Sequence, residues 1–185
     1  MAALRRVPRH EYVPVELRPM AYVDSPLPIG FDKTISQPFI VALMTDLLDL
    51  QPTDKVLEIG TGLGYQSAVL AELVANVFTI EYIEELGQEA RSRLSRSGYR
   101  NIEFRIGDGA LGWPQHAPFD KIIVTAAPEL IPGPLISQLK RGGRMVVPAG
   151  IAEAQQLLVV EKDDSGRART REIIPVRFSA LMSAD

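Results

Sequence analysis

Residues 56–66 read Val-Leu-Glu-Ile-Gly-Thr-Gly-Leu-Gly-Tyr-Gln, a short apolar run followed by three alternating glycines. Glycine lets the backbone bend sharply after a strand and lets a ligand approach the chain closely. The spacing is GxGxG, and Tyr65 stands where the dinucleotide motif GxGxxG would have its last glycine. A strand, a glycine turn and a helix in this order predict a nucleoside site on an open α/β sheet.

Strands and helices alternate around this stretch. A helix capped by Ser36 and ending near Leu50 comes first, because apolar residues recur there at helical spacing. The repeated unit predicts an α/β fold, a doubly wound and mostly parallel sheet with helices on both faces. The further strands are expected at 55–60, 77–81, 102–106, 121–124 and 144–147, and the further helices at 65–74, 84–97 and 134–139. A turn at Gly142-Gly143 is expected just before the last of these strands.

The two ends of the chain differ from this core of residues 36–150. Dense prolines in residues 1–35 favour extended segments and turns that wrap the surface. In residues 151–185, strands at 156–161 and 171–178 flank a charged turn with a glycine, which predicts a β-hairpin at one edge of the sheet. No repeat or linker interrupts the chain, so we expect one domain.

Composition restricts the function. The 185 residues are 46% hydrophobic and 23% charged, which is typical of a globular domain, and the net charge of −3 argues against nucleic acid as a partner. The absence of cysteine excludes disulfides and cysteine nucleophiles, and two distant histidines leave little for a metal site, so none is expected. Without an apolar leader or spanning run, we expect a cytoplasmic protein with no membrane partner.

Acidic residues follow three successive strands. Glu81 ends the second strand, where a carboxylate can accept hydrogen bonds from both ribose hydroxyls of an adenosine. Asp108 and Gly109 follow the third, and Glu58 lies just before the glycine loop. An acid beside the loop suits a ligand with a positive end, such as the amino group and sulfonium of S-adenosylmethionine. This pattern is typical of class I methyltransferases, whereas GxGxG and the lack of a hydride-site acid disfavour an NAD-dependent oxidoreductase.

Missing residues narrow the methyl acceptor. Without cysteine, methylation of cytosine C5 through a covalent adduct is excluded, and residues 124–128 (Val-Thr-Ala-Ala-Pro) lack the run that adenine N6 enzymes carry there. A phenolic acceptor needs a base or a metal, whereas a carboxylate is already ionised at pH 7. The sequence therefore favours a carboxylate acceptor.

From Val7 to Phe178 the chain resembles the protein-L-isoaspartate (D-aspartate) O-methyltransferase family. The segment Thr34-Ile35-Ser36-Gln37-Pro38 is the most specific match, since all class I methyltransferases share the glycine loop. Further matching segments are residues 7–10, 26–30, 56–66, 107–109, 112–114, 124–127, 142–144 and 175–178.

The resemblance implies methyl transfer from S-adenosylmethionine to the α-carboxylate of L-isoaspartyl, and possibly D-aspartyl, residues in damaged proteins. Ser36 would be the active-site serine, aiming the carboxylate without acting as a nucleophile. Other expected acceptor-binding residues are Thr34, Val176 and Arg177. The expected cofactor-binding residues are Ile35, Glu58, Gly60, Thr61, Gly62, Gly64, Tyr65, Gln66, Glu81, Asp108 and Gly109.

Other interpretations remain open from the residues alone. The acceptor could be a small-molecule carboxylate, or the chain could be a non-catalytic nucleoside-binding or interaction module. Ser36 could simply cap a helix. We expect a monomer. The chain departs from the family in two places. Leu63 stands where the family usually has a small residue. The family also normally begins with a further N-terminal helix, and this chain is expected to start at or after the end of that helix.

Overall fold

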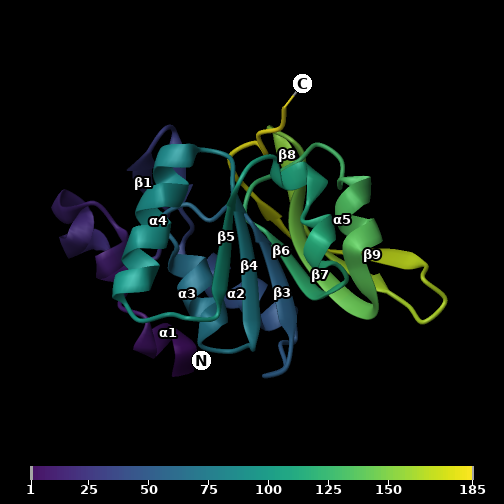
Figure 1. Ribbon diagram of the computed structural model, residues 1–185. Coiled ribbons are helices and arrows are strands. Elements are labelled where there is room, and N and C mark those ends of the chain that lie inside the picture. Colours follow the sequence, from purple (N-terminus) through teal and green to yellow (C-terminus); the bar gives the residue numbers. More distant parts are fainter. Residues whose placement is uncertain (1, 185) are drawn as a thin grey trace.

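The computed structural model describes residues 2–184 and is built around a seven-stranded sheet with the order β5-β4-β3-β6-β7-β8-β9 (Figure 1). The first five strands in this order are parallel, and β8 and β9 are antiparallel additions at one edge. The predicted fold class is therefore confirmed. The strands are β3 (Lys55–Ile59), β4 (Asn76–Glu81), β5 (Ile102–Ile106), β6 (Phe119–Val124), β7 (Leu139–Ile151), β8 (Ala154–Lys162) and β9 (Ala168–Val176).

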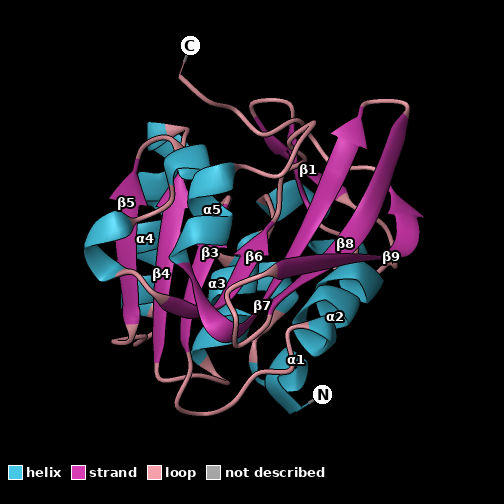
Figure 2. Cartoon of the chain, turned by 90° about the vertical axis from the view of Figure 1, so that its right-hand side faces the viewer, coloured by secondary structure: helices cyan, strands magenta, loops and turns pink. Residues whose placement is uncertain are grey.

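Helices cover both faces of the sheet. On one face lie α2 (Pro38–Leu47), α3 (Tyr65–Ala71) and α4 (Glu84–Arg96), and on the other lies α5 (Gly133–Gln138) (Figure 1). Figure 2, viewed from the hairpin side, shows α2 beside the antiparallel strands. No helix in residues 2–184 combines the length and apolar character that a membrane span requires.

The core lies in two layers because successive side chains of a strand point to opposite faces. Val56 and Val77 pack with α2 and α3, whereas Leu57 and Phe78 pack on the α5 side. All four are at most 6% exposed. Full burial of one such side chain contributes about 1.5–3 kcal/mol, so the apolar strands dominate the stability of this region.

The N-terminal residues wrap one side of this core. They form α1 (Ala2–Arg6), 3-10 helices at Arg9–Tyr12 and Val15–Met20, and the antiparallel hairpin of β1 (Leu27–Gly30) and β2 (Lys33–Ile35). Phe31 and Asp32 both have φ near +54°, so they form a two-residue turn of the type that fits a twisted hairpin. The sequence predicted extended segments and turns but missed these short helices.

Two expectations about local structure were wrong. A turn at Gly142-Gly143 was predicted to precede a strand from Arg144, yet β7 runs from Leu139 through both glycines. The register between β6 and β7 shifts there, so the glycines are absorbed as an irregularity within the strand. Ser36 does not cap α2 either, since the residue before the helix is Gln37 and neither side chain makes a cap hydrogen bond.

Candidate active site

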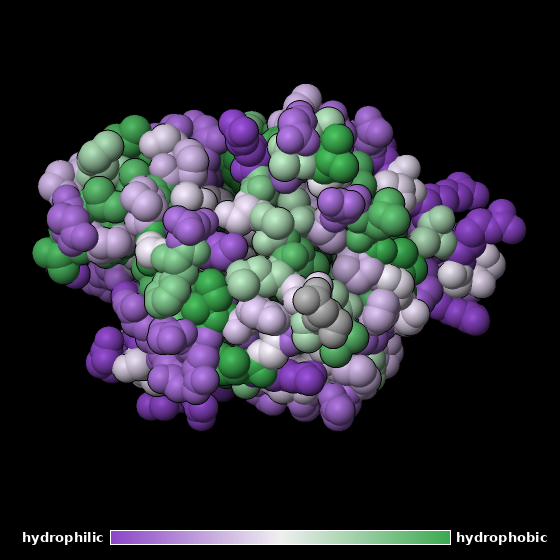
Figure 3. Space-filling view, turned by 90° about the horizontal axis from the view of Figure 1, so that it is seen from above, coloured by the Kyte–Doolittle hydropathy of each residue, from purple (hydrophilic) through white to green (hydrophobic). Residues whose placement is uncertain are grey.

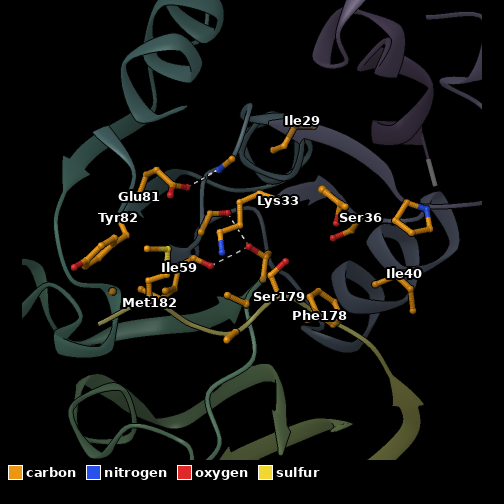
Figure 4. Close-up of a pocket in the computed structure, with 18 of the residues that line it drawn as sticks. Ile29, Lys33, Ser36, Ile40, Ile59, Glu81, Tyr82, Phe178, Ser179 and Met182 are labelled. Atoms are coloured by element: carbon orange, nitrogen blue, oxygen red, sulfur yellow. Dashed lines mark hydrogen bonds between the residues drawn. The ribbon is translucent and has the colours of Figure 1, made fainter. Parts of the chain in front are cut away.

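A cavity of about 550 Å³ opens at the carboxyl ends of the parallel strands. This is where open α/β sheets bind ligands, and the volume lies in the usual range for small-molecule sites. Figure 3 shows this end of the molecule, with apolar and pale side chains over much of the middle and the strongly hydrophilic hairpin turn projecting at one side. Figure 4 shows that side chains from both termini and from the central strands meet in the cavity.

The glycine loop forms the floor of the cavity. Gly60, Gly62 and Gly64 have φ of +95°, +56° and +91°, a region that side-chain-bearing residues rarely adopt. A Cβ atom on Gly60 would lie 2.4 Å from Thr125 Oγ1, and one on Gly64 would lie 2.8 Å from Leu94 Cδ1. Both glycines are therefore required by conformation and by packing.

Glu81 is fixed at one end of the cavity, where β4 ends (Figure 4). Its Oε2 accepts a hydrogen bond from Gly62 N at 2.8 Å, and its Oε1 accepts one from Ile83 N at 3.0 Å. Each carboxylate oxygen can accept a second hydrogen bond. With apolar neighbours Ile80 and Leu86, the carboxylate suits an adenosine, so these residues fit the nucleoside of S-adenosylmethionine.

Glu58 lies beneath the loop and lines neither this cavity nor a smaller pocket of about 50 Å³ that adjoins it. It is fully buried; its Oε2 accepts hydrogen bonds from Ser67 Oγ and from Thr79 Oγ1, the latter at 2.7 Å. Thr61 Oγ1 lies 2.6 Å from Thr79 Oγ1, so this chain of hydroxyls ties the loop to the acid. Burial raises the pKa of the Glu58 carboxyl to about 7, because the charged form loses hydration.

Ser36 lies at the opposite end of the cavity from Glu81 (Figure 4). Within residues 2–184 its hydroxyl has no hydrogen-bond partner, because the start of α2 is held by another residue. Asp24 Oδ1 accepts the Phe39 N–H at 2.9 Å, and Asp24 Oδ2 accepts from Gln37 Nε2 at 3.0 Å. The Ser36 hydroxyl thus remains available to a ligand.

The C-terminal segment forms one wall of the cavity. Gln155 holds Phe178 through two side-chain bonds, 2.7 Å from Phe178 N and 3.1 Å to Phe178 O. Beyond it, Ala127 N donates to Ser179 O and Leu181 N donates to Ala127 O. This ladder carries Met182 to the cavity.

The predicted site residues occupy several environments. The main cavity is lined by Thr34, Ser36, Gly60, Gly62, Glu81, Gly109, Val176 and Arg177. An adjoining pocket of about 50 Å³ is lined in part by Ile35, Thr61, Tyr65 and Gln66. Gly64, Glu58 and Asp108 line neither; Asp108 Oδ1 accepts from Ala110 N and its Oδ2 accepts from Ala184 N.

Sequence reasoning missed other lining residues. Apolar ones include Ile59 and Ile80, whose position at strand ends could have indicated them; Tyr82 also follows a strand. Lys33 comes from the β1–β2 hairpin, and Met182 from the C-terminal segment. No motif marked these two, because their place depends on how the chain ends fold over the sheet.

Comparison with known proteins gives one consistent result. Residues 1–185 match the family described as protein-L-isoaspartate(D-aspartate) O-methyltransferase. A protein-L-isoaspartate O-methyltransferase 1 of Polaromonas is 65% identical over 185 residues, which are all of this chain and 78% of the relative.

Solved structures resemble the chain over nearly its whole length. A protein-L-isoaspartate O-methyltransferase superposes with a TM-score of 0.88 at 30% identity, covering 98% of this chain and 60% of that one. A Plasmodium falciparum structure in complex with S-adenosyl-L-homocysteine superposes with a TM-score of 0.86 at 21% identity, covering 99% of this chain and 89% of that one. At 21% identity, the similarity to the Plasmodium falciparum structure shows a shared fold.

Proposed function

The chain belongs to the protein-L-isoaspartate(D-aspartate) O-methyltransferase family, and from this premise we propose which of its residues carry the reaction. The family acts on damaged proteins with isoaspartyl residues, and S-adenosylmethionine is the cofactor. When bound, this cofactor supplies a methyl group carried on a positively charged sulfur. The acceptor is the isoaspartyl α-carboxylate, which is ionised at neutral pH and needs no general base.

In this proposal the glycine loop and Glu81 would hold the cofactor. Glu81 accepts hydrogen bonds from the ribose hydroxyls through its remaining lone pairs, and Gly60 and Gly62 allow the ligand to approach the backbone. Glu58 acts indirectly by fixing Thr61 through Thr79. Gly109 lines the cavity and would contact the nucleoside, whereas Asp108 acts indirectly by accepting hydrogen bonds from Ala110 N and Ala184 N.

Ser36 orients the acceptor. Its hydroxyl would donate a hydrogen bond to one carboxylate oxygen and so leave the other oxygen free to accept the methyl group. The single observation that carries this proposal is the position of a hydroxyl that has no hydrogen-bond partner among the described residues 2–184, across the cavity from Glu81. Orientation of two reactants can lower a barrier by up to roughly 7–11 kcal/mol, so aiming alone suffices as a catalytic role.

The apolar walls assist by excluding water. Opposite charges on carboxylate and sulfonium neutralise each other as the methyl group is transferred, so a wet site would stabilise the reactants more than the transition state. Ile59, Ile40 and Phe178 supply such walls around the cavity. The exposed edge strand β9, ending at Val176, can align an extended peptide through main-chain hydrogen bonds.

The test compares an isoaspartyl peptide with its normal aspartyl twin. We expect methylation of the first only, and Ser36→Ala should lower the rate about ten- to a hundredfold, the worth of one hydrogen bond to a charged group. Ser137→Ala is the matched control, because that hydroxyl bonds Gly133 O within α5. A D-aspartyl peptide measures the family's second acceptor. Equal rates for both serine variants would reject the role of Ser36.

We also propose that the enzyme works as a cytoplasmic monomer, without nucleic acid or membrane. The net charge of −3 supports the lack of a nucleic-acid partner. Sedimentation of the purified chain and fractionation of cells that express it test the two remaining points. A dimer in sedimentation or a membrane-bound fraction would contradict them.

A further inference from the structure

Lys33 lines the cavity and carries a positive charge, but the proposed function assigns it no role. Three charged side chains, Lys33, Glu81 and Arg177, line the cavity. Glu81 is already bound to two backbone N–H groups, and Arg177 is exposed. Lys33 is half-buried, and within residues 2–184 its ammonium group forms neither an ion pair nor a hydrogen bond.

The backbone holds Lys33 in place. It is the first residue after the two-residue turn at Phe31 and Asp32, and it pairs with Gly30 across the hairpin. Three residues further on is Ser36. Figure 4 shows the Lys33 side chain entering the middle of the cavity, between Glu81 on one side and Ser36 on the other. The ammonium group therefore stands between the two proposed ligand sites.

A cation in this position suits a carboxylate. An ammonium group removed from bulk water among apolar side chains loses hydration, and a bound anion compensates for that loss. The two reactants of the proposed function offer two such groups: the acceptor carboxylate and the carboxylate on the amino-acid part of the cofactor. A lysine that only covered apolar surface with its stem would be indifferent to either one.

We propose that Lys33 binds a reactant carboxylate in the middle of the cavity, a role that rests on the proposed function. The ion pair would fix the position of that carboxylate in the cavity. Removing the charge should weaken binding of the ligand that carries the carboxylate about ten- to a hundredfold, and restoring a cation should recover most of it.

The experiment uses the full chain with Lys33→Met, Lys33→Arg and the control Lys121→Met. Lys121 lies on β6 and does not line the cavity. Its replacement by methionine makes the same change in net charge without changing the cavity. Calorimetric titration compares S-adenosylhomocysteine with 5′-methylthioadenosine, which keeps the nucleoside and the sulfur but lacks the carboxylate. Initial rates with the isoaspartyl peptide give KM and kcat, and thermal melting confirms that each variant is folded.

Two results support the proposal and identify the source of the carboxylate. If Lys33→Met weakens S-adenosylhomocysteine binding at least tenfold but leaves methylthioadenosine unchanged, Lys33 holds the cofactor. If both affinities are unchanged while KM for the peptide rises at least tenfold, more than kcat falls, Lys33 holds the acceptor. In either case Lys33→Arg should stay within a few-fold of the wild type.

Other results overturn it. Lys33→Met could behave like Lys121→Met in every measurement, or it could lose affinity equally for both nucleosides. Either finding would show that Lys33 does not bind a reactant carboxylate. Failure of the proposed function has a different signature, because the wild-type chain itself would then leave the isoaspartyl peptide unmethylated. The two titrations would still decide whether Lys33 recognises the cofactor carboxylate.

Discussion

The two ends of the cavity are built in different ways. We call the end around Glu81, proposed to hold the cofactor, the cofactor end, and the end around Ser36, proposed to hold the acceptor, the acceptor end. At the cofactor end, Glu81 accepts hydrogen bonds from Gly62 and Ile83, and Glu58 accepts one from Thr79. At the acceptor end, Ser36 has no partner within residues 2–184, and its segment is anchored by exposed Asp24.

This difference reflects where each end comes from in the chain. The cofactor end consists of the carboxyl ends of β3 and β4, whose strands are buried on both faces. The acceptor end consists of segments from the two chain termini that fold over the sheet. We therefore expect substitutions at the cofactor end to affect stability and ligand affinity together, and those at the acceptor end to separate them.

The largest effect should come from Gly60→Ala. The backbone strain at φ +95° and the 2.4 Å approach to Thr125 Oγ1 act together, and we expect a loss of about 2–6 kcal/mol in the free energy of unfolding. Urea denaturation measures it. Gly62→Ala is the control, since its Cβ would meet only Ile29 Cδ1 at 3.4 Å and should cost about 1–2 kcal/mol. Equal losses in both variants would contradict the packing argument.

The second effect is a pH dependence at the cofactor end. The pKa of Glu58 is about 7 in the folded chain against the ordinary 4.5, so the native state keeps a proton that the unfolded state releases. The contribution of Glu58 to the free energy of unfolding should therefore be greatest below pH 4.5, fall between pH 4.5 and 7, and level off above. The fall is on the order of 3 kcal/mol.

Glu58→Gln cannot titrate, so its free energy of unfolding should lack this fall. Urea denaturation of the ligand-free wild type and variant at several pH values from 4.5 to 7.5 tests it. Parallel stability curves would show that folding leaves the pKa of Glu58 at its ordinary value.

The third effect concerns cofactor affinity. Glu81→Gln keeps one accepting oxygen but removes the charge, so S-adenosylhomocysteine should bind about 1.5–3 kcal/mol more weakly. Exposed Glu85→Gln, at the start of α4, is the control for net charge. Calorimetric titration compares the two. An unchanged affinity in folded Glu81→Gln would place the ribose elsewhere.

The cofactor end could be predicted from sequence because its determinants are local. An apolar strand, the glycines and Glu81 at the next strand end fix the site through strand geometry alone. Glu58 was the exception. The pattern placed an acid beside the loop, but the alternation of strand faces and the hydroxyls of Ser67 and Thr79 placed its side chain beneath it.

The acceptor end was less predictable. Local sequence favoured Ser36 as a helix cap, and only the resemblance of residues 34–38 to a known family indicated an active-site role. Capping by Asp24, which is distant in sequence, and the entry of Lys33 into the cavity depend on tertiary contacts. Periodicity and propensity do not encode such contacts.

The smallest effect should separate stability from catalysis at the acceptor end. Asp24→Ala removes the acceptor for Phe39 N at the start of α2, so it should lower the free energy of unfolding by about 1 kcal/mol. Asp24→Asn keeps an accepting oxygen and should recover most of this loss. Ser36→Ala should leave stability within about 0.5 kcal/mol, because the hydroxyl caps nothing.

Urea denaturation and initial methylation rates on the same preparations separate these effects. Asp24→Ala should keep full affinity for S-adenosylhomocysteine, because its contacts lie at the far end of the cavity from Glu81, and should lower the methylation rate by a few-fold as the segment around Ser36 loosens. Ser36→Ala should lose far more rate without losing stability. A stability loss in Ser36→Ala as large as that in Asp24→Ala would make the serine a structural cap after all, and the two ends of the cavity would then be built alike.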